Sequence, residues 1–281
     1  MTFAGGATLG AMETRFDRDT ALERLGPNRF LGRIDPGWHV LRGPNGGYVA
    51  AIVLRALGLA VDDPARAPRS LTVHYTAPPV AGPITIETAL ERRGRSLSTV
   101  SARMTQEGRL LALALGAFSI PREGLDFQHL PMPAVAPPAA ASPMPRREGE
   151  TIPIHGRYEY RWAVGEPPWS GASEAVCGGW IRLAEGPRAA DAALVAAYTD
   201  AWPPASFSWA RPGQNVGGLP TIDLTIHFRA PLPLQDAAAD EWHLAVFRSR
   251  VARHGFVEED GEVWSEGGVL VAQSRQLALI V

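Results

Sequence analysis

Hydrophobic and polar residues alternate along two stretches of the chain that match each other closely. Residues 70–78 read SLTVHYTAP and residues 223–231 read DLTIHFRAP, and five of the nine pairs are identical. Alternation with a period of two is typical of a half-buried strand. Leu224, Ile226 and Phe228 form the predicted apolar face. The two copies lie 153 residues apart, too far for a solenoid repeat, and therefore predict a duplicated domain.

Three more strand-like segments follow each copy of the repeat. We expect them at about residues 84–90, 97–104 and 109–119 in the first half, and at 243–247, 255–259 and 269–279 in the second. Three glycine-containing pairs are predicted as hairpin turns: Gly94-Arg95, Glu107-Gly108 and Asp260-Gly261. The pattern therefore predicts a run of four antiparallel strands in each half.

One helix is predicted before each repeat strand. In the first half it spans about residues 46–60, with Asn45 as its N-cap. In the second half Pro187 suits the first helical position, and Leu194 and Tyr198 fall on one side of the helix. A curved antiparallel sheet wrapped round one long helix is the simplest way to bury both apolar faces. We therefore predict an α+β protein of two similar domains.

A proline-rich stretch separates the two halves. Residues 121–153 hold eight prolines, a composition that favours an extended spacer. The expected organisation is a first domain at residues 1–120, a linker at 121–153 and a second domain at 154–281.

Composition excludes several classes of function. The 281 residues are 46% hydrophobic with a net charge of −2, which indicates neither a nucleic acid nor a membrane surface as partner. Every basic residue is arginine, so lysine Schiff-base chemistry is excluded. Cys177 is the single cysteine, so no internal disulfide can form. We see no apolar run long enough to span a bilayer and no signal peptide, and therefore expect a cytoplasmic protein.

Common catalytic motifs are missing from the sequence. It contains no G-x-S-x-G nucleophile elbow, no G-x-G-x-x-G and no P-loop. The seven histidines are scattered without the spacing of metal ligands, so no metal site is expected.

A few polar residues remain as candidates for chemistry, each beside a simpler interpretation. Asp223 stands where the first copy has Ser70, so only the second copy can supply a base there. It can equally be an edge or surface carboxylate. Gln276 lies in the last predicted strand, where it can simply face solvent. Gly46 and Gly47 can form a tight turn at the helix start, or a cradle of N–H groups for an oxyanion.

Five stretches together resemble the acyl-CoA thioesterase II family and its thioesterase-like relatives, which are double hot-dog proteins. The matching residues are 45–49, 70–79, 221–231, 255–257 and 268–279. The resemblance covers nearly the whole chain apart from the extreme N-terminus and the linker. It implies two tandem hot-dog domains, each a curved antiparallel sheet around one long helix.

The resemblance also implies an activity and its residues. Family members hydrolyse an acyl-CoA thioester to free acid and CoA by an oriented water, in lipid metabolism, without cofactor, metal or covalent intermediate. In this sequence Asp223 is placed as the general base, and Gln276 and Ser249 as residues that hold the water. The stretch around Ser249 is shorter than in the family, so Arg248 or Arg250 can occupy its place instead. Backbone N–H groups of Gly46 and Gly47 would polarise the carbonyl.

Two other functions stay open. A non-catalytic protein that binds acyl thioesters needs the same fold without its chemistry. An enoyl-thioester hydratase wants a close Asp/His pair. Asp223 and His227 are about 13 Å apart along a strand, which disfavours the hydratase.

Exposed sheet edges favour pairing of the halves or of whole chains, so a homodimer or higher homo-oligomer is expected.

Overall fold

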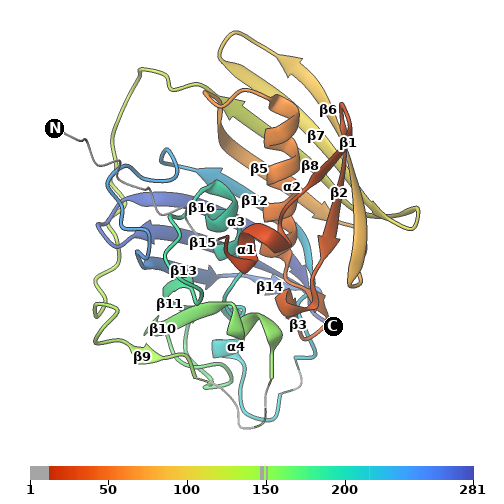
Figure 1. Ribbon diagram of the computed structural model, residues 1–281. Coiled ribbons are helices and arrows are strands. Elements are labelled where there is room, and N and C mark those ends of the chain that lie inside the picture. The colour runs from red at the N-terminus through yellow and green to blue at the C-terminus, as the bar shows by residue number, and fades with distance from the viewer. Residues whose placement is uncertain (1–12, 146–148, 150, 215) are drawn as a thin grey trace, which may run out of the picture.

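The computed structural model describes residues 13–145, 149, 151–214 and 216–281. In this part of the chain one large antiparallel sheet runs through both halves, with helices packed against it (Figure 1). Its strands follow the order β1-β2-β6-β7-β8-β5-β12-β16-β15-β13-β11-β10-β9. No helix among these residues is long and apolar enough to cross a membrane.

The two halves build their parts of the sheet in the same way. The first half contributes β1 (Glu23–Gly26), β2 (Arg29–Ile34), β5 (Ala67–Tyr75), β6 (Gly82–Arg93), β7 (Leu97–Gln106) and β8 (Arg109–Ser119). The second contributes β10 (Tyr158–Val164), β11 (Ala175–Leu183), β12 (Thr221–Phe228), β13 (His243–Ser249), β15 (Phe256–Ser265) and β16 (Leu270–Leu279). Short strands outside these runs are β3 (His39–Val40), β4 (Gly43–Pro44), β9 (Ser142–Pro143) and β14 (Ala252–Arg253). The four-strand run predicted for each half is confirmed.

The two copies of the sequence repeat lie side by side at the centre of the sheet. β5 pairs antiparallel with β12, and Thr72 faces its own counterpart Thr225. Their hydroxyl oxygens are 3.0 Å apart. A strand pair in which equivalent residues face each other is what a two-fold axis between the halves produces. The predicted exposed edge of each half is therefore paired with the edge of the other half.

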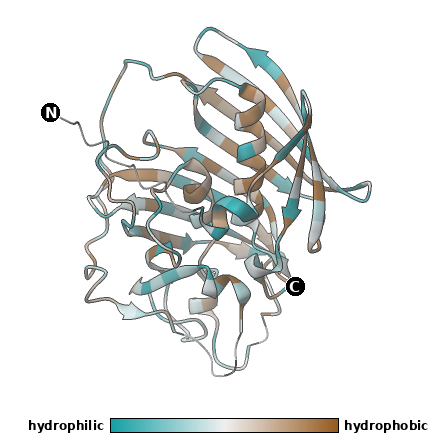
Figure 2. Ribbon diagram, in the orientation of Figure 1, coloured by the Kyte–Doolittle hydropathy of each residue, from teal (hydrophilic) through white to brown (hydrophobic). Residues whose placement is uncertain are grey.

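The helix of the first half is α2 (Gly46–Val61), close to the range predicted. Asn45 caps it by accepting a hydrogen bond from the N–H of Tyr48 at 3.0 Å, as expected. Most of its side chains are buried, and Figure 2 colours it as mostly hydrophobic along its length. A helix that is apolar nearly all round must be enclosed. The curved strands β5 to β8 lie along it (Figure 1).

The second half has a shorter helix than predicted. α3 spans Ala192–Tyr198, with Asp191 as its N-cap, so the predicted start at Pro187 is wrong. Arg188 explains the later start, because its guanidinium hydrogen-bonds both Asp17 and Asp191 and fixes the segment before the helix. Pro203 and Pro204 follow, and they prevent the helix from continuing. A further turn, α4, spans Ser206–Trp209.

The pair Asp260-Gly261 is not a turn, which corrects the prediction. Both residues lie inside β15. A side chain at Gly261 would meet the ring of Phe247 at 2.9 Å, so the glycine makes room for a buried aromatic on the neighbouring strand. The turns predicted at Gly94-Arg95 and Glu107-Gly108 fall between strands as expected.

The proline-rich linker packs against the second half instead of standing free. The indole N–H of Trp180 donates to the carbonyl of Ala136 at 2.8 Å. Met132 and Val135 pack with Trp180 against the buried ring of Trp264. Residues 142–143 form β9 at the edge of the sheet. The predicted linker residues 146–148 and 150 lie outside the described residues.

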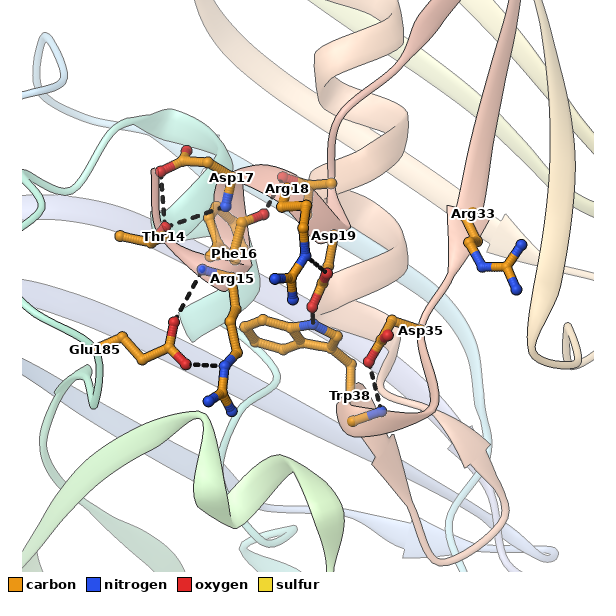
Figure 3. Close-up of polar contacts among 12 residues, drawn as sticks. Thr14, Arg15, Phe16, Asp17, Arg18, Asp19, Arg33, Asp35, Trp38 and Glu185 are labelled. Carbon is orange, nitrogen blue, oxygen red and sulfur yellow. Dashed lines mark hydrogen bonds and ion pairs between the residues drawn. The ribbon is translucent and has the colours of Figure 1, made fainter. Parts of the chain in front are cut away.

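Short polar elements near the start of the chain tie the two halves together. α1 (Arg15–Asp19) and the 3₁₀ turn η1 (Pro36–Trp38) belong to the first half. Figure 3 shows Arg15 facing Glu185 of the second half and Asp19 accepting from the indole of Trp38, at 2.9 Å. In addition, Arg157 of the second half pairs with Asp35 of the first at 3.1 Å. These groups satisfy one another, so the cluster is a junction between halves.

Candidate functional site

The end of α3 meets the start of α2 at a single carboxylate, Asp200. Its Oδ2 accepts from the backbone N–H of Gly47 and from the side-chain amide of Asn45, both at 3.0 Å. The positive end of the α2 dipole therefore faces this carboxylate. A side chain at Gly47 would come within 2.6 Å of the Ala197 carbonyl oxygen, so glycine is needed for the two helices to approach.

Gln276 of β16 brings the last strand to the same carboxylate. Its side chain lowers the pKa of Asp200 by a hydrogen-bonding contribution. Its Oε1 accepts from the hydroxyl of Thr221 at 2.8 Å, and its Nε2 donates to Glu259 at 2.9 Å. Gln276 is buried, and Thr221 and Glu259 come from β12 and β15 on either side of it. The predicted solvent-facing interpretation of Gln276 does not hold.

Glu259 is a second buried carboxylate beside the first. Its Oε2 accepts from the backbone N–H of Ala205 at 2.6 Å. Ala205 precedes α4, so this bond ties β15 to the segment that follows α3. The thiol of Cys177 donates to the carbonyl of Pro203 at 3.0 Å in the same region.

The environment of the two carboxyls raises their pKa values. Burial raises the pKa of Asp200 to about 6, while hydrogen bonds from Gly47, Gln276, Gly46 and Asn45 act against it. Burial also raises the pKa of Glu259 to about 7, with a smaller contribution from the charge of Asp200. Asp200 keeps part of its surface accessible. A carboxylate with a pKa near neutrality and access to solvent suits a general base.

The predicted residues do not all reach this site. Gln276 pairs with Leu224 and so shares its face of the sheet. Asp223 precedes Leu224 on β12 and points to the opposite face. It pairs with His74 of β5 across the junction of the halves. The structure therefore does not bring Asp223 and Gln276 together.

Ser249 ends β13, and β15 lies between that strand and β16. At the spacing of neighbouring strands, Ser249 and Gln276 are roughly 10 Å apart, too far for a shared hydrogen bond. Ser249 lines an open groove of about 650 Å³ together with Trp209, Arg248 and Arg250. Its hydroxyl is buried with no hydrogen-bond partner among the described residues.

Gly46 and Gly47 stand where an oxyanion cradle was predicted. Here their N–H groups hold the carboxylate of Asp200, which is an oxyanion supplied by the protein itself. The hydroxyl of Tyr75 donates to the carbonyl of Gly46 at 2.7 Å and supports the same turn. These N–H groups are therefore occupied by a residue of the other half, and their predicted role towards a thioester carbonyl stays a prediction.

Three residues of the site were not found from the sequence: Asp200, Thr221 and Glu259. Asp200 follows a short apolar helix and reads as a capping or solvent-facing residue. Thr221 begins the stretch 221–231 that resembles the family, so its position was included there, though no role was predicted for it. Glu259 ends the predicted strand at 255–259, in an acidic run beside a predicted turn, and nothing there indicates a buried carboxylate.

Two family models together match most of the chain. The model of the acyl-CoA thioesterase C-terminal domain matches residues 138–280, and that of the N-terminal domain matches residues 34–119. The chain is 26% identical over 259 residues to acyl-CoA thioesterase 2 of Haemophilus influenzae, covering 84% of this chain and 86% of that protein.

Solved structures agree on the fold. A conserved protein of unknown function with a hot dog fold from Alicyclobacillus acidocaldarius is 30% identical, with a TM-score of 0.83, covering 95% of this chain and 97% of that one. A putative thioesterase II from Thermobifida fusca YX is 26% identical, with a TM-score of 0.81, covering 96% and 98%. The α+β double hot-dog fold expected from the sequence is confirmed.

Proposed function

Because this chain belongs to the acyl-CoA thioesterase family, we propose that it hydrolyses an acyl-CoA thioester to a free acid and CoA at Asp200. The observation that carries this proposal is the carboxylate of Asp200. Burial raises its pKa to about 6, its Oδ2 accepts from the N–H of Gly47, and Gln276 adds a hydrogen-bonding contribution that lowers the pKa. The proposal needs no metal and no covalent intermediate.

In this mechanism Asp200 accepts a proton from a water molecule as that water attacks the thioester carbonyl carbon. The tetrahedral intermediate then collapses, the carbon–sulfur bond breaks, and the proton held by Asp200 passes to the leaving thiolate. Thr221 holds the side chain of Gln276 by its hydrogen bond, and Gln276 in turn orients the carboxylate and the water. A thioester is electrophilic enough that such positioning suffices.

The roles predicted for Asp223 and Ser249 stay predictions, and one experiment separates them from Asp200. Thiol release is measured from acyl-CoAs of short to long chain with wild type, Asp200→Asn, Asp223→Asn and Ser249→Ala. We expect Asp200→Asn to lower kcat by about 100-fold or more, the usual range for a lost general base. Asp223→Asn and Ser249→Ala should stay within about threefold of wild type.

The opposite ranking of the two aspartates would return the role of base to Asp223. Acyl-CoA binding without thiol release by wild type would instead support the non-catalytic binding protein. Loss of the double bond from an enoyl-CoA, with no thiol released, would support the hydratase.

A further inference from the structure

Glu259 makes contacts that its role as a strand residue does not require. It is 8% exposed. Its two oxygens accept from Gln276 and from the N–H of Ala205, at 2.9 and 2.6 Å. Among the described residues no arginine lies within ion-pair distance of it. A buried carboxylate without a cation destabilises a fold, so an apolar residue would serve packing better.

The contacts of Gln276 explain what the carboxylate does. A side-chain amide has an oxygen that only accepts and a nitrogen that only donates, so its two orientations are chemically different. Thr221 cannot select between them, because a hydroxyl donates or accepts as needed. An ionised carboxylate only accepts, so above its pKa of about 7 Glu259 requires the nitrogen of Gln276 on its side. The second N–H of that nitrogen is then available to Asp200.

While it is ionised, Asp200 likewise can accept hydrogen bonds but cannot donate them. In the proposed reaction it gains a proton, and a protonated carboxyl can donate as well as accept. At that step Asp200 no longer dictates the orientation of the Gln276 amide. Glu259 takes no proton from the water in this scheme, and it is anchored independently by Ala205.

We infer that Glu259 is a positioning residue that acts through Gln276, holding the amide with its oxygen towards Thr221 and one N–H towards Asp200. This inference rests on the proposed function, since its effect on rate requires Asp200 to be the base. No contact between Glu259 and substrate is needed. The site thus contains two buried carboxylates with different work: one accepts the proton, and the other fixes the amide between them.

A double-mutant cycle tests the inference by kinetics. Glu259→Gln keeps the shape of the side chain, but its amide cannot accept from Ala205 and from Gln276 at once. We expect kcat to fall about tenfold or more and KM to change less than threefold. In a Gln276→Met background, Glu259→Gln should have no further effect on kcat, because the residue through which it acts is gone. A residue that supports only the fold gives additive losses in such a cycle.

The matched control is Glu262→Gln, which removes one carboxylate from the same strand. Glu262 pairs with Arg248 and has no contact with Gln276. It should leave kcat within about twofold of wild type. Additive effects in the cycle, a change confined to KM, or wild-type kcat in Glu259→Gln would each overturn the inference.

A second measurement decides the matter even if no acyl-CoA is hydrolysed. Side-chain amide signals of ¹⁵N-labelled protein are recorded, and Gln276 is assigned by the signal lost in Gln276→Met. We expect slow hydrogen exchange of this amide in wild type and in Glu262→Gln, and exchange at least tenfold faster in Glu259→Leu. Unchanged exchange in Glu259→Leu overturns the inference. A wild type without thiol release across the panel overturns only the proposed function.

Discussion

Single residues set the acid–base behaviour of this protein, beginning with Asp200. Its carboxylate is the group we propose as base, and burial holds its pKa at about 6. A base must be ionised, so kcat/KM should fall about tenfold per pH unit below pH 6. The hydrogen bond from Gln276 lowers this pKa, so Gln276→Met should move the acid limb to higher pH. Thiol release measured between pH 5 and 8 checks both. A kcat/KM that stays level down to pH 5 would contradict the assignment.

Glu259 gives stability a pH dependence of its own. Burial raises its folded-state pKa to about 7, above the value in an unfolded chain, so the folded state binds more protons near neutrality. Its contribution to stability is complete at low pH and is lost as the pH rises through 7. Between pH 6.5 and 8 the unfolding free energy should therefore fall by about 1 kcal/mol.

Urea unfolding at these two pH values measures that fall, and Glu259→Gln should remove most of it. The pH range of the urea measurement begins at 6.5 to exclude the titration of His243. Burial lowers the pKa of His243 to about 4, and this histidine makes stability rise with pH at lower values. A fall of equal size in Glu259→Gln would assign the effect to another group.

The elements of the fold were predictable where local pattern decides them. The alternation in the two repeats fixed β5 and β12, and Asn45 with a long apolar run fixed α2. α3 was misplaced because contacts with the distant Asp17 hold the segment after Pro187. The gathering of Asp200, Gly47 and Gln276 was not predictable, because residues far apart in sequence meet only when the halves pack. Local periodicity carries no record of such contacts.

Two glycines of α2 should respond in opposite ways to the same substitution. A side chain at Gly47 would meet the Ala197 carbonyl at 2.6 Å and Asp200 Cβ at 3.0 Å. Gly47→Ala should therefore destabilise by about 1 to 3 kcal/mol, the range for overpacking, and lower activity. At Gly58 a side chain meets Phe118 at an ordinary 3.9 Å, so Gly58→Ala should stabilise by about 0.5 to 1 kcal/mol.

Thermal or urea unfolding of the two single variants gives the comparison. Both changes add one methyl group to the same helix, so helix propensity favours both. Only the contact with α3 differs. If Gly47→Ala were as stable as wild type, the close approach of α2 and α3 would not hold in solution.

At the scale of the whole molecule, sequence differences between the two duplicated halves explain why the site is asymmetric. A two-fold axis between Thr72 and Thr225 would create two equivalent sites. Only one helix start carries the Asn45-Gly46-Gly47 sequence, and only the end of α3 supplies the carboxylate that faces it. Each half therefore contributes a different part, and neither half holds the site alone.

The expected assembly of whole chains into a homo-oligomer stays a prediction, which light scattering of the purified protein can decide.

The halves should remain one folding unit even when the chain between them is cut. They share the β5–β12 pairing, one hydrophobic core and the ion pairs of Figure 3. Leu125 of the linker is almost fully exposed, so a protease site placed there can be cleaved without unfolding. We expect both fragments to elute together at the size of the intact protein and to retain thiol release. An intact chain and a cut chain should each unfold in one transition, because the paired central strands hold the halves together. Separation of the fragments under native conditions would show instead that the linker, and not the shared sheet, maintains the site.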